Sequence, residues 1–389
     1  MIRSAQLAVR PSRLHGAEES MKDRRRDACT TIQTEDKGGD MRHRLTWKVA
    51  AGHRRFAAIA LYACVTLCLT GAPACAVPTL DEVAADFGLS KDDAQRVRNG
   101  ELVNTTTKET SDRELAVVML FLVKTPVQKL VAAFKGGPSS RNDPQVQSAT
   151  EISGEGALDD FKGIVLQPGG DKEAKRYLDA APGDTLNLSM PEIASFAALK
   201  AAGGAGQPQV EEALRKMLLV RYQTYRSQGL AGIAPYARGK DKQSQPADDL
   251  RRATEAAKGV KKYAAAFYDV LMNYPQGIPA GLMQHFFCIR YAMSGRPNFA
   301  LRQRLALPVE DAYVIADRDF YVSSGYNDTQ AVAGLLPVEN GTVVVYLNRT
   351  TTDQLGGFGA SAKQAIGRGM MAKQISEIFE KARAGLKSQ

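Results

Sequence analysis

The stretch from residue 299 to residue 387 constrains the fold of this chain most strongly. It holds four apolar segments in which apolar and polar residues alternate, turn residues between them, and a long basic amphipathic segment at its end. Alternation with a period of two is typical of strands that bury one face, whereas apolar residues three and four apart are typical of a helix. The stretch therefore predicts antiparallel strands followed by one helix.

Three of these strands can be assigned two faces from the alternation. The first places Arg302 and Arg304 opposite Phe299, Leu301, Leu305 and Leu307. The second places Tyr313, Asp317, Asp319 and Tyr321 opposite Val314, Ala316, Arg318, Phe320 and Val322. The third follows the Asn-Gly hairpin signal Glu339-Asn340-Gly341 and puts on one face Val343, Val345, Leu347 and Arg349. Ser361 is expected to cap the final helix, whose inner stripe is predicted to be Ile366, Met370, Ile375, Ile378, Phe379 and Leu386.

Upstream, two capping boxes predict short helices over 79–88 and 90–99. Strands are expected at 100–107 and 115–123, and the second is apolar on both faces, as in a strand covered on both sides. Pro126 is expected to open a helix that Gly136-Gly137-Pro138 ends. Two more strands are predicted, at 147–152 and 161–166.

From residue 171 to residue 294 the apolar period becomes helical. Helices are predicted at 191–199, 210–228, 246–258 and 260–274. A block of helices between two blocks of strands indicates an insertion or a second subdomain. Short loops favour helices that pack on the sheet.

Residues 41–76 are predicted to be a signal peptide. MRHRLTWKVAAGHRRF is basic and free of acid, AAIALYACVTLCLTGAPACA is uncharged, and Ala74 and Ala76 form a small-residue cleavage site before Val77. A periplasmic or secreted protein, cleaved near Ala76-Val77, is therefore expected. A lipoprotein anchor at Cys75 is the disfavoured alternative, because Ala72-Pro73-Ala74 is a poor lipoprotein motif. Residues 1–40 are interpreted as a disordered extension or the product of a start codon assigned too early.

Charge and cysteine content exclude several classes of function. The formal net charge is +9, but residues 1–76 hold 13 of the 51 Lys+Arg and 7 of the 42 Asp+Glu, so the remainder has 38 and 35. The basic excess lies mostly in the predicted leader, and no nucleic-acid partner is predicted. After cleavage only Cys288 and His285 of their kinds remain, which excludes an intramolecular disulfide and a His-rich or Cys-rich metal site. No cofactor is predicted.

The order strand, helix, antiparallel strands and long C-terminal helix resembles the START-like, or helix-grip, fold. The resemblance implies an α+β protein in which a curved antiparallel sheet grips the last helix and leaves a cavity for an apolar ligand between them. It assigns 77–99 to an N-terminal helical segment, 100–170 and 295–389 to the START-like domain, and 171–294 to a large helical insertion.

Four phrases resemble an uncharacterised family of exported bacterial proteins. They are FGLSKDDAQRVRNGELV (87–103), SDRELAVV (111–118), ADRDFYVSSGYNDTQ (316–330) and YLNRTTTDQLGGFG (346–359). This resemblance spans nearly the whole chain after residue 76. It implies export and supplies no chemistry.

Two arginines are candidate ligand-binding residues. Arg318 and Arg349 continue apolar alternations, which aims a guanidinium at the interior of the protein. A buried charge needs a carboxylate partner or an anionic ligand, and the planar fork of arginine suits either. The alternatives are that Arg318 pairs with a neighbouring acid and that Arg349 reaches water at the end of its strand.

A concentration of polar and aromatic residues extends this candidate site. Its members are Tyr321, Tyr326, Asp328, Gln330, Tyr346 and Asn348. In a cavity fold such groups orient a mostly apolar ligand, whereas on an exposed hairpin they pair across strands. His285 and Cys288 share a face if their segment is helical, yet the apolar neighbours of the thiol favour an inert buried cysteine.

The leading hypothesis is an exported binding protein for a hydrophobic small molecule or lipid, neutral or anionic. One alternative is a cavity-based hydrolase or isomerase in which Asp328, Tyr326 or Tyr321 acts as acid or base. Another is a cell-envelope interaction module that uses the helices of 171–294. The basic final helix also allows a peripheral contact with an anionic membrane, although a solvated face is favoured.

Overall fold

The computed structural model describes residues 77–135, 143–183, 185–203, 205–239, 241–293, 295–357 and 359–387. The predicted extension 1–40, the signal peptide and the candidate anchor Cys75 lie outside these residues. So do the expected helix stop at 136–138 and the side chain of Leu386.

An eight-stranded antiparallel sheet forms the centre of the described chain. Its order is β1-β2-β10-β9-β8-β7-β6-β3. The first four strands are β1 (Val103–Thr106), β2 (Glu114–Val123), β3 (Val146–Glu151) and β6 (Met283–Met293). The others are β7 (Arg296–Val309), β8 (Ala312–Val322), β9 (Asp328–Val338) and β10 (Gly341–Thr351). A separate two-stranded ladder joins β4 (Tyr236–Ala237) to β5 (Gln243–Ser244).

Helices precede, interrupt and follow the strands. The first group is α2 (Leu80–Asp86), α3 (Lys91–Arg98) and α4 (Val127–Lys135). The inserted group is α5 (Asp171–Leu178), α6 (Met190–Ala201), α7 (Gln207–Gln228), α8 (Pro246–Ala256), α9 (Lys258–Tyr263) and α10 (Ala265–Asn273). The last helix is α11 (Ala360–Lys387), and short 3-10 helices span Leu158–Phe161 and Gly229–Gly232.

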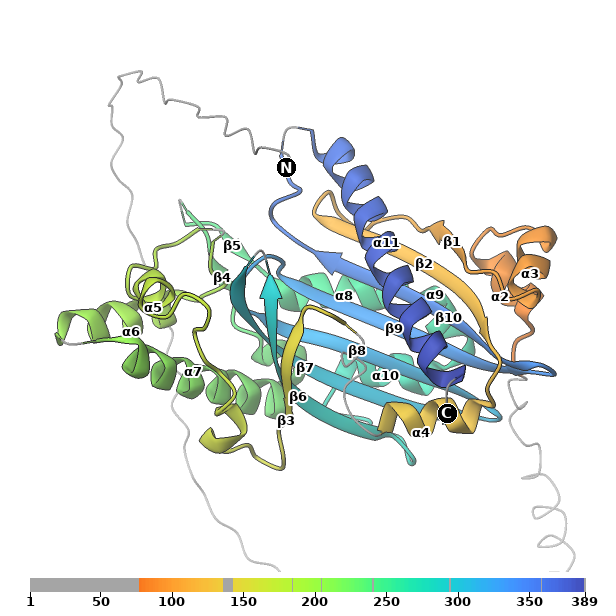
Figure 1. Ribbon diagram of the computed structural model, residues 1–389, viewed down its shortest axis with the longest axis horizontal. Coiled ribbons are helices and arrows are strands. Elements are labelled where there is room, and N and C mark those ends of the chain that lie inside the picture. The colour runs from red at the N-terminus through yellow and green to blue at the C-terminus, as the bar shows by residue number, and fades with distance from the viewer. Residues whose placement is uncertain are drawn as a thin grey trace, which may run out of the picture. The chain divides into compact units, whose positions relative to one another are not determined.

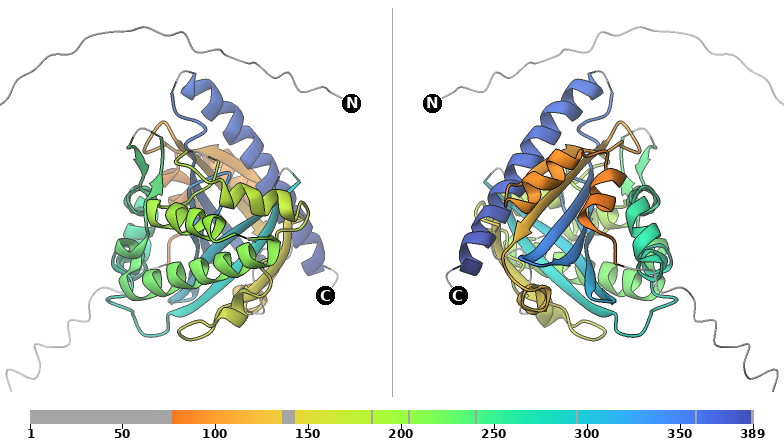
Figure 2. Two further views of the ribbon diagram at one scale, coloured as in Figure 1. Left: turned by 90° about the vertical axis from the view of Figure 1, so that its left-hand side faces the viewer. Right: turned by 90° about the vertical axis from the view of Figure 1, so that its right-hand side faces the viewer.

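Helices cover both faces of the sheet (Figure 1). The long α11 crosses one face over β2, while α8, α9 and α10 lie behind the strands. Figure 2 shows α11 along one side of the sheet and the inserted helices along the other. We call these the α11 face and the insert face of the sheet.

Each face has its own apolar core, as the alternation requires. On the insert face the strands contribute Phe299, Leu301 and Leu305 to a cluster with α7 and α10. Also on that face, Leu120 and Val345 pack with α2 and α3. On the α11 face Phe121 packs against Phe379, with ring centroids 4.7 Å apart. Because β2 is buried on both faces, its unbroken apolar run is explained.

The predicted fold class is confirmed: the protein is α+β, with an antiparallel sheet against a long C-terminal helix and a helical insertion. Both capping boxes are present, from Thr79 to Glu82 and from Ser90 to Asp93. The predicted hairpin is also present, since Gly341 pairs with Val338 across a two-residue turn.

Three expected elements are wrong in detail. Residues 161–166 form no strand, because the Leu158–Phe161 turn and its neighbours are built from local hydrogen bonds. The helix expected at 260–274 is broken at Ala264, where φ is −144°. The helical assignment up to residue 294 fails after Asn273, because 283–293 is strand β6, paired along its length with β7.

A β-bulge changes the faces predicted for the end of β8. Leu301 pairs with Tyr321 but Arg302 pairs with Asp319, so Phe320 is an extra residue in the ladder. An extra residue reverses the alternation beyond it. Tyr321 therefore packs in the insert-face core, and Val322 lies on the α11 face, the reverse of the sequence assignment.

The predicted inner stripe of α11 is also corrected. Phe379, Ile375 and Ile378 are partly buried as expected, but Ile366 and Met370 are 66% and 69% exposed. At the start of the helix the sheet is instead approached by Gly367, where an added Cβ would lie 3.0 Å from Leu115. A small residue at this contact lets the helix lie close, which turns Ile366 outward.

Candidate functional site

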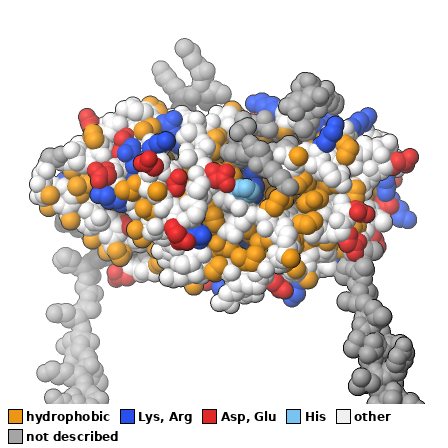
Figure 3. Space-filling view, turned by 90° about the horizontal axis from the view of Figure 1, so that it is seen from below, with side chains coloured by type: hydrophobic (Ala, Val, Ile, Leu, Met, Phe, Trp, Pro, Cys, Tyr) orange, Lys and Arg blue, Asp and Glu red, His pale blue; other side chains and the backbone are white. Residues whose placement is uncertain are grey.

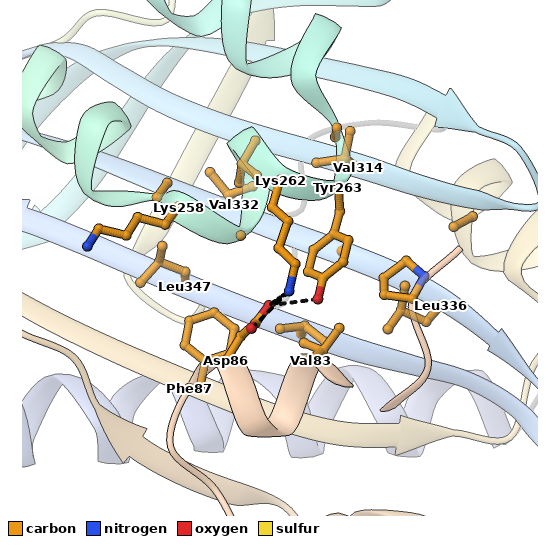
Figure 4. A pocket seen from close by; sticks show the side chains of 18 of the residues that line it. Val83, Asp86, Phe87, Lys258, Lys262, Tyr263, Val314, Val332, Leu336 and Leu347 are labelled. Carbon is orange, nitrogen blue, oxygen red and sulfur yellow. Dashed lines mark hydrogen bonds and ion pairs between the residues drawn. The ribbon is translucent and has the colours of Figure 1, made fainter. Parts of the chain in front are cut away.

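A mostly apolar cavity of about 320 Å³ lies on the insert face of the sheet. One wall is α2, the opposite wall runs from the end of α8 through α9, and the floor is formed by β8, β9 and β10 (Figure 4). Its apolar lining includes Val83, Phe87, Val314, Val332, Leu336, Val345 and Leu347. Its size falls at the lower end of small-molecule sites, which measure roughly 300–1,000 Å³.

Local sequence signals place both walls. The capping box at Thr79 begins α2, so that Leu80, Val83 and Ala84 are buried toward the sheet. On the other side α8 ends at Ala256, and the short α9 (Lys258–Tyr263) follows it. Breaks at Ala257 and Ala264 separate α9 from α8 and from α10. The short α9 therefore spans the cavity as a separate segment. The floor contains Gly334, whose missing side chain adds room above the strand.

Asp86 joins the two walls at the rim of the cavity. Its carboxylate accepts a hydrogen bond of 2.7 Å from the Tyr263 hydroxyl and one of 2.9 Å from Lys262 Nζ. Burial raises the pKa of Asp86, but the hydrogen bonds from Tyr263 and Lys262 outweigh it, so the pKa is lowered. Figure 4 shows these contacts crossing the opening between α2 and α9.

Arg349 is the charged residue in the lining that is almost fully buried, at 3% exposure. Its Nη1 donates to Glu114 Oε2 at 2.8 Å, and both terminal nitrogens donate to the Lys108 carbonyl at 3.2 Å. Its Nε is buried and has no hydrogen-bond partner among the described residues. The arginine therefore does not reach water at a strand end, and its partner is a protein carboxylate.

Arg318 lies deeper, 1% exposed, and its described partners are all neutral. Gln330 Oε1 accepts from its Nε and Nη2 at 3.0 and 2.6 Å, and the Leu271 carbonyl accepts at 2.8 Å. Tyr225 and Thr254 complete the shell at 3.3 and 3.2 Å. No ion pair of Arg318 is found within the described ranges, so the expected neighbouring acid is not its partner there.

Asp328 and Asp249 form a buried acidic pair on the insert face. They are 1% and 3% exposed, and each has an Oδ2 without a hydrogen-bond partner among the described residues. Burial, then the charges of Asp249 and Glu114, raises the pKa of Asp328 well above its ordinary value. The pKa of Asp249 is also raised, first by burial, although Arg113 and Arg252 oppose the shift.

The other predicted site residues lie on different faces of the sheet. Tyr321 is on the insert face, where the Arg221 guanidinium lies 4.3 Å from its ring centre. Tyr326 donates to Asp319 at 2.8 Å among residues of the α11 face. Tyr346 contacts Phe379 of α11 and accepts from Asn348 at 3.0 Å. Of the eight predicted residues, Arg349 alone lines this cavity.

His285 and Cys288 do not meet. They lie on strand β6, not on a helix, and residues three apart on a strand face opposite sides. Cys288 packs in the insert-face core, and burial raises its pKa to about 12. His285 instead contacts Glu151 at 2.7 Å.

Seen from below, hydrophobic side chains gather on the right half of the molecule in Figure 3, with charged groups mostly toward its left and margins.

The walls contributed by α2 and α9 were not predicted as part of a site. Their sequences show only capping signals and helical spacing, which are common to any helix. A usable signal was the sequence KGVKKY at 258–263, in which basic residues and one tyrosine follow a break in the apolar period. The cavity also lies on the opposite face from the one expected, since α11 packs on the other side of the sheet.

The described part of the chain holds no group of three or more His, Cys, Asp or Glu that could bind a metal ion. Among the helices described, none is long and apolar enough to cross a membrane.

Comparisons with known proteins place the chain in no family. No family model matches it, and no curated protein matches it. Among solved structures it is similar to Ara h 8.0201, at 13% sequence identity over 27% of this chain and 67% of that chain. The TM-score is 0.20, too low for any inference from the likeness. The resemblance to exported bacterial proteins therefore stays a prediction.

Proposed function

We propose that the protein binds a hydrophobic small molecule or lipid in the cavity between α2, α9 and the sheet. The supporting observation is the cavity itself: about 320 Å³ with a mostly apolar lining and a few polar groups at its margins. Leaving such apolar surface exposed to water costs about 25 cal/mol per Å² relative to covering it. A bound apolar molecule would remove that cost.

A cavity-filling variant tests this proposal. Gly334 lines the floor, and a Cβ added there meets only Val345, at 3.9 Å. Gly334→Leu is expected to weaken Nile red binding at least about tenfold, since the leucine occupies the ligand space. Fluorescence titration measures the affinity, and native mass spectrometry shows whether the purified protein carries a molecule.

Ala85→Leu is the matched control, because Ala85 is exposed on the outer side of the same helix wall. It adds similar volume outside the cavity and is expected to leave Nile red affinity unchanged. If wild-type protein binds no Nile red and carries no ligand, or Gly334→Leu binds as tightly as wild type, the proposal is wrong.

The two alternative functions, a hydrolase or isomerase and an interaction module, have less support in the structure. Tyr321, Tyr326 and Asp328, the acid or base residues of the hydrolase or isomerase hypothesis, are outside the cavity lining. For an interaction module on the inserted helices, the large apolar side chains described as exposed are Met190 on α6 and Val220 on α7, one on each helix.

We also propose that α11 contacts an anionic membrane surface. Ile366 and Met370 lie one turn apart and are 66% and 69% exposed. Lys363 and Lys373 are exposed on the same part of the helix, and residues 360–376 contain no Asp or Glu. Exposed apolar residues flanked by lysines suit insertion at an interface, where each cation near anionic lipid adds about 1 kcal/mol.

Vesicle co-sedimentation tests the contact. Wild-type protein is expected to bind vesicles that contain phosphatidylglycerol, and the double change Ile366→Ser and Met370→Ser is expected to reduce binding at least about fivefold. Both residues are exposed, so folding should be retained. Equal binding by wild type and the double variant would contradict the contact.

A further inference from the structure

The charged side chains that line the cavity do not balance one another. They are Asp86, Lys258, Lys262 and Arg349. Asp86 pairs with Lys262 at 2.9 Å, and Arg349 pairs with Glu114 at 2.8 Å. Within the described part of the chain, the amino group of Lys258 has neither an ion-pair partner nor a hydrogen-bond partner. Among these residues one positive charge of the lining is therefore left uncompensated.

Lys258 places that charge where the cavity meets water. It is the first residue of α9 and is exposed, although it also belongs to the lining. In Figure 4 its nitrogen lies apart from the contacts that Asp86 makes with Lys262 and Tyr263. A lysine covers apolar surface with its stem while its ammonium group stays in water. The flexible stem therefore lets the ammonium group meet a ligand head group at the opening.

The interior of the cavity does not suit an ionised group. Apolar side chains such as Val332 and Leu336 form much of the lining. The charge of Arg349 is met by Glu114, which is 1% exposed, and the Nε of Arg349 is buried. An anion placed at this depth would lose its hydration and gain no free cation. A charged ligand therefore has to leave its head group at the opening.

Resting on the proposed function, we propose that the ligand is a single-chain amphiphile with a carboxylate head group. Its apolar chain fills the cavity, and its carboxylate lies at the opening and pairs with Lys258. A carboxylate carries a single negative charge, which one lysine balances, whereas a phosphate monoester carries about −1.5 to −2 at neutral pH. The anion-binding role expected of Arg318 and Arg349 thus passes to a residue of α9.

The test uses three molecules with the same ten-carbon chain as competitors of Nile red. They are decanoate, decan-1-ol and decan-1-amine, which at about pH 8 are anionic, neutral and cationic. The wild-type protein is expected to bind decanoate at least about fivefold more tightly than decan-1-amine, because Lys258 attracts the first head group and repels the second. Decan-1-ol reports the contribution of the chain.

Reversing the charge at residue 258 should reverse the preference. Lys258→Glu is expected to weaken decanoate binding at least about tenfold, since repulsion replaces attraction, and to strengthen decan-1-amine binding about fivefold. Decan-1-ol affinity should stay within about twofold, because an uncharged head group has no such interaction. Lys258→Gln, which removes the charge without reversing it, should weaken decanoate about fivefold. Lys258 is exposed, so both variants should fold.

Lys261→Glu is the matched control. Lys261 is an exposed residue of the same helix, its ammonium group lies 5.4 Å from the ring centre of Tyr268, and it is outside the cavity lining. The change alters the net charge of α9 as much as Lys258→Glu does. Decanoate affinity should nevertheless stay within about twofold of the wild type, because a surface charge away from the ligand contributes little.

Distinct outcomes separate this inference from the proposed function. If Nile red binds but decanoate binds no more tightly than decan-1-amine, the carboxylate ligand is wrong and cavity binding survives. The same holds if Lys258→Glu leaves decanoate affinity unchanged, or if Lys261→Glu weakens it equally. Should Lys258→Glu fail to fold, an unchanged decanoate affinity in Lys258→Gln overturns the inference. Absence of Nile red binding in the wild type overturns the proposed function and the inference together.

Discussion

Two strand arginines of this protein differ in the groups that surround their positive charge. Arg302 is held by Asp319, with Nε to Oδ1 at 2.6 Å and Nη2 to Oδ2 at 3.0 Å. Arg318 is surrounded by neutral acceptors. The alternation placed Arg302 opposite the apolar face of its strand and Arg318 on the apolar face of the next strand, but the partner of neither could be read from the sequence. The energetic consequence of losing each should differ.

We expect Arg302→Met to destabilise the protein by about 3–5 kcal/mol, because it leaves the fully buried Asp319 carboxylate unpaired. Arg318→Met should cost less, about 1–3 kcal/mol, because only neutral acceptors lose a donor. Urea denaturation of the two variants measures the difference. An equal or larger cost for Arg318→Met would show that its charge has a partner in the folded protein.

The buried carboxyl group of Asp328 should make the stability of the protein depend on pH. Because its pKa is raised on folding, chiefly by burial, the stability linked to this group is complete below its ordinary pKa of 3.8 and is lost as the pH rises through the raised value. The groups that act on it are Asp249 and Glu114, with Arg113 and Arg252 opposing them. Asp328→Asn should therefore stabilise the protein at neutral pH, by about 1–3 kcal/mol, and change little near pH 3.8.

Asp353 supplies a control of opposite sign. Burial raises its pKa, but hydrogen bonds from Ser244, Arg238 and Arg113 lower it to about 2. Its stability contribution is present above its ordinary pKa and is lost only as the pH falls toward 2. Asp353→Asn should thus destabilise the protein at neutral pH. If Asp328→Asn destabilises the protein at neutral pH, as Asp353→Asn is expected to, the assignment for Asp328 is wrong.

At the scale of elements, one group of polar contacts joins α2 to α9 on the opposite wall of the cavity. Asp86 contacts Lys262 and Tyr263 of α9, and its side chain is 34% exposed. Exposed ion pairs contribute only about 0–1 kcal/mol to stability. We expect Asp86→Asn to speed Nile red dissociation several-fold, because α2 and α9 separate more easily, while the free energy of unfolding changes by less than about 1 kcal/mol.

Stopped-flow fluorescence measures this dissociation rate. The matched control is Asp81→Asn, which removes an exposed pair with Arg98 at 2.7 Å between α2 and α3, outside the cavity lining. The same acceleration in both variants would show that general loosening of α2, and not the rim contact, controls exchange.

Much of the element pattern was predictable, and its errors have physical causes. Strands β7 to β10 and helix α11 were found because alternation and helical spacing are local properties. Strand β6 was missed because QHFFCIR is apolar without clear alternation, so only its pairing with β7 decides its state. The Phe320 bulge, which moves Tyr321 to the other face, likewise depends on the partner strand.

At the scale of the whole molecule, the predicted export of the chain can be checked directly. We propose that processing leaves Val77 as the first residue, which keeps in the mature chain both Val77 and Pro78 of the cavity lining. Expression in a bacterial host with an active export pathway, followed by intact mass measurement, should give a periplasmic protein that begins at Val77. Retention of residues 41–76, or a lipid-modified Cys75, would contradict this.

The sequence by itself determined the fold class, the order of most strands along the chain and the positions of Arg318 and Arg349 on apolar strand faces, because periodicity and capping act over a few residues. Tertiary structure decided which face each helix covers and therefore where the cavity lies. It also decided that Arg349 meets Glu114, 235 positions away, while Arg318 meets only neutral groups. Such pairings depend on the order of the strands in the sheet and on where the helices pack. Local sequence patterns carry no information about either. For that reason Arg349 is the one member of the scattered predicted set that lines the cavity in the structure.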